Sequence, residues 1–201
     1  SSAKTAGYTV AGTDRNGVIR FSGLSADVTL TLPAASGLTG FRFTFINLDG
    51  TYGVTADGNG SETIDGFTTR KTFGSDPIEL YCDGSNWFTV SGSWLYYSGD
   101  IAYTNGSTGT LAHGLGKRPK NIWYELRCNT TELNYSVNDV AVSSDADFTD
   151  GGIYTGMSST IDATNIVYRV SSNGFFLTNK TTGVVAPITA ANWRLRVYAE
   201  T

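Results

Sequence analysis

Residues 41–47 read FRFTFIN, and this stretch decides the class of fold. Phe41, Phe43 and Phe45 occupy every second position. Side chains in an extended strand point to opposite faces in turn, so the three rings share one face. Alternation of this kind is typical of a β-strand with one buried side.

The same alternation recurs along the whole chain. It is found in VTLTLPA (28–34), IELYC (78–82), NIWYELRC (121–128), NIVYRVS (165–171) and WRLRVYA (193–199). Turn-forming residues separate such stretches, as in DRNG (14–17), LDGTYG (48–53), DGNGSE (57–62) and DGSN (83–86). Glycine makes up 24 of 201 residues, and no long segment has the 3.6-residue period of a helix. The sequence therefore predicts an all-β protein.

Two local pairings follow from the turns. DGSN is expected to close a hairpin between 78–82 and WFTVS (87–91), and SSNG (171–174) is expected to join NIVYRVS to GFFLTN. The last strand, 193–199, has one apolar face and one face bearing arginines. We expect it to be tied into a sheet whose outer face meets water.

The pattern changes around SGSWLYYSGD (91–100), where serine and glycine flank four bulky residues. We therefore predict two β-sandwich or jelly-roll-like domains in tandem, at 1–92 and 99–201, joined by an aromatic hinge at 93–98. Small domains bury a modest share of their surface, so oligomerisation is an expected source of further stability.

Charge and composition argue against several classes of protein. The net charge of −4 and 14 scattered basic residues do not suit nucleic-acid binding. No apolar run approaches the 18 residues of a membrane span, and the opening SSAKTAGYTV lacks the apolar core of a secretory signal. Cys82 and Cys128 lie in different predicted domains, so we expect two buried free thiols rather than a disulfide.

The stretch LAHGLGKRPKNIWYELRC (111–128) contains the only histidine, His113. Its glycines and basic residues lack the spacing of a phosphate-binding loop, and no serine sits in a G-x-S-x-G turn. We expect His113 to be structural and Pro119 to mark the start of a strand. The sequence predicts no catalytic residues, and one histidine with two distant cysteines does not make a zinc site.

Two acidic loops raise the question of calcium: DGNGSETIDG (57–66) and SSDADFTDGG (143–152). Oxygen ligands at alternate positions suit Ca²⁺, but neither loop matches the EF-hand pattern. Asp, Asn and Gly are also the residues that solvated turns require. We expect no cofactor, with Ca²⁺ at 143–152 as the alternative.

Outward-facing aromatic and charged residues in the second half are the candidate ligand contacts. Aromatic rings beside Asp, Asn and Arg are common in polar interfaces. The alternative is sheet packing or a subunit interface. The predicted ligand-binding residues are Trp123, Arg127, Asp145, Asp147, Asp150 and Tyr154.

Several longer motifs resemble those of a known protein family. VTLTLPAASGLTGFRFTFINLDG (28–50), SETIDG (61–66) and IELYCDGSNWFTVSG (78–92) together resemble a module of tailed-bacteriophage fibre and spike proteins, over about residues 8–92. AHGLGKRPKNIWYELRC (112–128), NYSVNDVAV (134–142), IDATNIVYRVSSNGFFLTNKTTG (161–183) and TAANWRLRVYA (189–199) resemble C-terminal domains of phage tail fibres and of spikes on phage-like particles.

The resemblance implies a virion protein made in the host cytoplasm, without membrane insertion. It implies a homotrimer that contacts other virion proteins and binds a host polysaccharide or outer-membrane protein. The C-terminal domain is then expected to face the receptor and the N-terminal domain to be structural. The alternatives are a capsid decoration or tail-assembly protein without a receptor, and a capsule-degrading enzyme.

Overall fold

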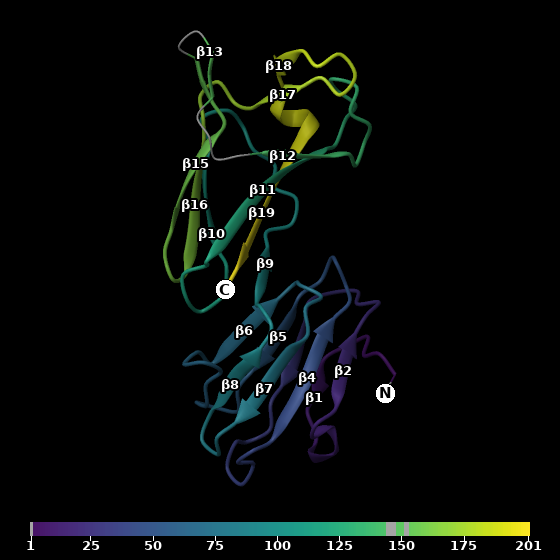
Figure 1. Cartoon of the computed structure of the whole chain (residues 1–201), viewed down its shortest axis with the longest axis vertical. Helices are drawn as coiled ribbons and strands as arrows, with labels where there is room; N and C mark the ends of the chain where they lie inside the picture. Colours follow the sequence, from purple (N-terminus) through teal and green to yellow (C-terminus); the bar gives the residue numbers. More distant parts are fainter. Residues whose placement is uncertain (1, 144–147, 151–152) are drawn as a thin grey trace. The chain divides into compact units, whose positions relative to one another are not determined.

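The computed structural model describes residues 2–143, 148–150 and 153–201 (Figure 1). Within these ranges the elements are β-strands and two short 3₁₀ turns, η1 (Gly12–Asp14) and η2 (Ala190–Asn192). The strands form several sheets in β-sandwich-like units. The prediction of an all-β fold is confirmed.

The chain divides into two compact units. Unit 1 contains the chain up to Tyr96 together with Gly114–Lys117 and Glu200–Thr201, and unit 2 contains Tyr97–His113 and Arg118–Ala199. The division between Tyr96 and Tyr97 falls within the stretch 93–98 that the sequence singled out. The return of two short later segments to unit 1 was not expected from the sequence.

Unit 1 consists of two four-stranded sheets, with strand orders β1-β3-β5-β6 and β2-β4-β7-β8. The strands are β1 (Tyr8–Thr9), β2 (Val18–Phe21), β3 (Val28–Thr31), β4 (Arg42–Asn47), β5 (Val54–Asp57), β6 (Thr69–Thr72), β7 (Ile78–Cys82) and β8 (Trp87–Ser91). From β1 to β5 the chain alternates between the two sheets. As a result β1, β3 and β5 pair in parallel, as do β2 and β4.

This winding differs from a jelly roll, whose strands pair antiparallel. Parallel neighbours need a crossover between them, and here each crossover is a strand of the opposite sheet. The unit closes with antiparallel pairs, including the predicted hairpin β7–β8, in which Cys82 pairs with Trp87. The Asp83 carboxylate caps that turn by accepting hydrogen bonds from the amides of Ser85 and Asn86, each at 2.7 Å.

The aromatic face formed by β4 and the residue before it is the centre of unit 1. Phe41, Phe43 and Phe45 are at most 1% exposed. Trp87 contacts the rings of Phe41 and Phe43 edge to face, with centroids 5.9 Å apart in both pairs. Burial of each such ring contributes several kcal/mol, as judged by the about 3–5 kcal/mol that phenylalanine or tryptophan truncation removes from a core.

A charged side chain is also buried in unit 1. Arg70 on β6 is 1% exposed and forms an ion pair with Asp65. Its guanidinium lies 4.5 Å from the centroid of Trp94, and it donates to the carbonyl of Leu115 at 2.9 Å. The Asp65 carboxylate also accepts hydrogen bonds from the amide and hydroxyl of Thr89, at 2.8 and 2.6 Å. The residues at 114–117 are thus held by a buried cation.

Unit 2 contains β10 to β18, β19 up to Ala199 and the last residue of β9, in a sheet of order β12-β11-β19-β9, a sheet of order β10-β16-β15 and two hairpins, β13–β14 and β17–β18. The strands are β9 (Leu95–Tyr97), β10 (Thr108–Ala112), β11 (Asn121–Cys128), β12 (Val140–Ser143), β13 (Phe148–Asp150), β14 (Ile153–Thr155), β15 (Met157–Ile161), β16 (Asn165–Val170), β17 (Phe176–Thr178), β18 (Val185–Pro187) and β19 (Trp193–Glu200). The hydroxyl of Tyr124 on β11 donates to that of Ser159 on β15 at 2.6 Å and so joins the two larger sheets.

The final strand has the two-faced character that its sequence predicts. Its apolar residues are all 0% exposed, whereas Arg194, Arg196 and Tyr198 are half-buried. The strand lies inside its sheet, between β11 and β9. The prediction that the last strand is tied into a sheet is confirmed.

The predicted hairpin between 165–171 and 174–179 is wrong. β16 pairs with β10 and β15, whereas β17 pairs with β18. The turn at Ser171–Gly174 does form, with the amide of Gly174 donating to the carbonyl of Ser171 at 2.9 Å. Phe175 follows the turn and is buried, at 2% exposed, and the chain then enters a different sheet. Alternation identifies strands but does not identify their partners.

The two cysteines are free and buried, Cys82 in unit 1 and Cys128 in unit 2. Burial raises the pKa of both thiols. A raised pKa leaves the unreactive thiol form dominant near neutral pH. Both residues therefore pack as small apolar side chains, as the sequence predicted.

The buried ion pair in unit 1 gives a stability prediction. Arg70→Ala leaves the Asp65 carboxylate without its cation, and breaking a buried pair in this way costs about 3–5 kcal/mol. Arg42→Ala is the matched control, because Arg42 is 48% exposed and its pair with Glu79 contributes at most about 1 kcal/mol. Hydrogen exchange of the β4 and β7 amides measures both effects. Equal protection in the two variants would contradict the prediction.

Candidate ligand-binding site

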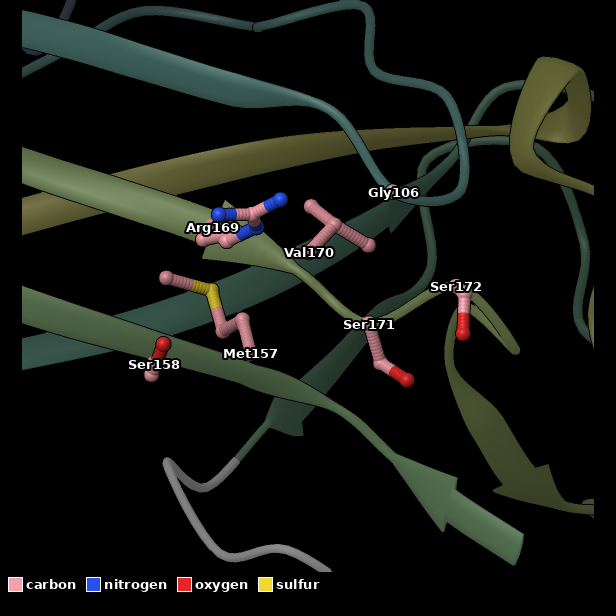
Figure 2. A pocket seen from close by; sticks show the side chains of 7 residues that line it. All are labelled: Gly106, Met157, Ser158, Arg169, Val170, Ser171 and Ser172. Carbon is pink, nitrogen blue, oxygen red and sulfur yellow. The ribbon is translucent and has the colours of Figure 1, made fainter.

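A pocket of about 340 Å³ lies in unit 2, at one end of the β10-β16-β15 sheet. Its walls come from the ends of β15 and β16, the loop after β16 and the loop before β10 (Figure 2). The lining residues are Gly106, Met157, Ser158, Arg169, Val170, Ser171 and Ser172. The volume is at the small end of the range for ligand pockets, roughly 300–1,000 Å³.

Backbone hydrogen bonds hold the two loops of the rim together. The amide of Gly106 donates to the carbonyl of Ser171 at 2.9 Å, and the amide of Val170 donates to the carbonyl of Ser107 at 2.8 Å. Gly174 has a φ of +70°, and a Cβ there would lie 2.4 Å from the side-chain oxygen of Asn105. The rim is therefore fixed by the fold, and a pre-formed site spares a ligand the entropy of ordering it.

The lining combines an apolar side with a polar one. Met157 and Val170 are 2% and 1% exposed, whereas Ser158, Arg169 and Ser172 are exposed. The strand register explains this arrangement. Thr108 on β10 and Ser158 on β15 both lie directly opposite Arg169 on β16, which places hydroxyl groups on either side of it on one sheet face.

Arg169 differs from Arg127, Arg194 and Arg196 of unit 2, whose side chains all have partners within the chain. No ion pair or side-chain hydrogen bond joins it to another residue in the part of the chain that the structure describes. Arg127 and Arg196, in contrast, both pair with Asp100. The pocket thus has one exposed guanidinium beside hydroxyl groups, an arrangement suited to an oxyanion.

Of the predicted ligand contacts, Trp123 lies in an aromatic stack. Its ring is 5.3 Å from that of Tyr198 at an interplanar angle of 2°, and Tyr97 stacks on Tyr198 at 4.9 Å. β19 lies between β11 and β9, so both faces of Tyr198 are covered. Burial raises the pKa of Tyr198, and the neighbouring Glu125 raises it further. The stack supports the sheet-packing alternative, because ring faces are used within the chain.

Arg127 is engaged in an ionic network on the same face. Its guanidinium lies 2.6 Å from Asp100 and donates to the side-chain oxygen of Asn138 at 2.6 Å. Arg196 donates to the other Asp100 oxygen at 2.6 Å. Burial raises the pKa of Asp100, but hydrogen bonds from Arg196 and Arg127 outweigh it and hold the pKa below its usual value. Arg127 therefore has a structural role: its ion pair fixes β11 next to Asp100.

Two of the remaining predicted contacts, Asp150 and Tyr154, lie on the hairpin β13–β14. Asp145 and Asp147 fall outside the described residues. Asp150 ends β13 and pairs with Ile153, and Tyr154 on β14 pairs with Thr149. The structure thus places Asp150 and Tyr154 on one hairpin and Trp123 and Arg127 on another sheet.

His113 is buried, at 2% exposed, and one ring nitrogen lies 3.3 Å from the carbonyl oxygen of Asp162. Burial lowers its pKa. In the loop that follows, Gly116 has a φ of +76°, and a Cβ there would lie 2.5 Å from the ring of Phe67. Gly116 is therefore required for packing, and Gly114 adopts a φ of +62° that favours glycine, so both glycines have structural roles.

The acidic loop at 57–66 also has structural roles. Both oxygens of Glu62 accept from the amide of Ala35, at 2.9 and 3.0 Å, and Asp65 is paired with Arg70. In the part of the chain that the structure describes, no three His, Cys, Asp or Glu residues gather as a metal site. Across the described ranges, no helix has the length and apolarity needed to cross a bilayer.

Comparison with protein-family models gave no match, and no curated protein matched the sequence.

Sequence reasoning missed the pocket. The alternation in NIVYRVSS placed Arg169 on an outward face, and two serines follow two residues later. That signal was available. However, Thr108 and Ser158 come to lie beside Arg169 only through the register of three strands, which the sequence does not reveal.

The Asp100 network gives a pH-dependent prediction. A carboxylate with a depressed folded pKa contributes stability above its unfolded pKa, near 3.9, and loses it as pH falls through the folded pKa. Asp100→Asn should lower the free energy of unfolding by about 1 kcal/mol at pH 7, as expected for a partly exposed network. The difference from wild type should shrink below about pH 4. Urea unfolding at several pH values measures it, and a pH-independent difference would contradict the assignment.

Proposed function

We propose that this chain is an adhesion module of a virion fibre or spike, and that unit 2 binds a glycan of the bacterial surface. The pocket beside Arg169 carries the proposal. It is concave, its exposed lining consists of hydroxyl groups and one cation, and its rim is held by backbone hydrogen bonds. Hydroxyl groups that can both donate and accept suit a polyhydroxylated ligand such as a sugar.

The proposed mechanism is multivalent. A small pocket gives weak single contacts, but linked copies raise the effective concentration and can increase avidity by about 10²–10⁴. Unit 1 would supply the structural part of the fibre. The exposed apolar side chains of Val18, Phe88 and Val90 on its β2-β4-β7-β8 sheet, each 40% exposed or more, support association between copies.

Adsorption of the fluorescently labelled full chain to a panel of encapsulated bacteria tests the proposal. We expect saturable binding to some strains, lost after their surface polysaccharide is removed enzymatically. Binding that survives this removal would indicate a protein receptor instead. No binding to any strain would favour the assembly-protein alternative, and release of reducing ends from the polysaccharide would favour the enzyme.

Multi-angle light scattering tests the proposed homotrimer. We expect a mass three times that of the chain at micromolar concentration. Phe88→Ser and Val90→Ser together should lower that mass, because they remove apolar area from the outer face of unit 1. A monomer at the same concentration in the unsubstituted protein would contradict the trimer.

A further inference from the structure

We infer that the pocket recognises an acidic sugar, with Arg169 pairing with the oxyanion and the neighbouring hydroxyl groups binding the ring. This inference rests on the proposed glycan binding and specifies its chemical class. The oxyanion can be a carboxylate, as in a uronic acid, or a phosphate, since a guanidinium binds both through two parallel hydrogen bonds.

The charge of the lining residues supports an acidic ligand. Arg169 is the one charged residue among the described lining residues, and it is exposed. The chain as a whole carries a net charge of −4. An exposed cation with no carboxylate partner among the described residues, in an otherwise acidic protein, forms a local site for an anion.

The other lining groups support a sugar rather than a bare anion. Ser158 lies directly opposite Arg169 in the strand register, and Ser171 and Ser172 lie on the loop that follows it. Hydroxyl groups can both donate to and accept from sugar hydroxyls. Met157 and Val170 are paired one position along from Ser158 and Arg169, so their side chains point to the buried face of the sheet and the hydroxyl groups remain as the sugar contacts.

The position of Arg169 supports ligand binding over a structural role. Its neighbours opposite on β10 and β15 are Thr108 and Ser158, neither of which is charged. The three arginines with structural roles, Arg70, Arg127 and Arg196, each have a carboxylate partner. Replacement of Arg169 should therefore leave folding unchanged.

Ligand-observed and protein-observed NMR with the full chain tests the inference. The probes are methyl glucuronide, its neutral counterpart methyl glucoside, and glucose 6-phosphate. We expect one or both acids to bind at least about 10-fold more tightly than the glucoside, since hydrogen bonds to a charged group contribute about 1.5–3 kcal/mol and 1.4 kcal/mol is tenfold. The tighter of the two acids identifies the source of the oxyanion.

Three variants locate the binding. Arg169→Met should weaken acid binding by roughly 10- to 100-fold. Arg169→Lys should retain an intermediate affinity, because the charge stays and the two-pronged geometry is lost. Arg118→Met is the matched control, as it removes the same charge from an exposed position of unit 2 and should leave binding unchanged. Amide spectra of each variant confirm the fold.

Equal affinity for the glucoside and the acids, or full acid binding by Arg169→Met, would overturn the inference. So would the absence of binding by both acids. Bacterial adsorption separates this failure from failure of the proposed function. If Arg169→Met adsorbs as well as the unsubstituted chain, adhesion stands and the pocket is not its site. If neither protein adsorbs, the adhesion proposal itself fails.

Discussion

The alternation of side chains along each strand is the constraint on which the structure depends. It turns the rings of Phe41, Phe43 and Phe45 into the core of unit 1, and it does the same for Trp193, Leu195 and Val197 in unit 2. Because one face of each strand packs against the core, polar side chains must lie on the other face or in the turns. The chemistry available to a ligand is therefore on outer sheet faces and in loops, which is where the pocket lies.

The arginines differ in their surroundings, which depend on the strand face each one occupies. Arg70 points inward and is stabilised by Asp65 and the ring of Trp94. Arg127 and Arg196 lie on an outer face and share Asp100. Arg169 also lies on an outer face, but hydroxyl groups flank it on both neighbouring strands. A cation that is solvated rather than paired is the group that a protein can offer to an anionic ligand without first breaking an internal ion pair.

The sequence predicted the fold class, eight of the strands, the β7–β8 hairpin and the buried thiols, because each depends on local alternation or on turn residues. It did not predict the parallel winding of unit 1 or the partners of β16. The spacing of apolar residues within one strand does not reveal which distant strand pairs with it. The same limit explains the site. Trp123 and Arg127 were recognised as outward-facing, yet cross-strand stacking on Tyr198 and pairing with Asp100 give them structural roles. Arg169 acquires its neighbours only from strand register.

Mapping amide chemical shifts of the isotopically labelled full chain during titration with a glucuronate-containing oligosaccharide tests the central claim most directly. The account predicts that the shifts concentrate at Gly106, Met157–Ser158 and Arg169–Ser172, the residues of the pocket. Shifts confined to the face formed by Trp123 and Tyr198 would contradict it, as would a spectrum that the oligosaccharide leaves unchanged.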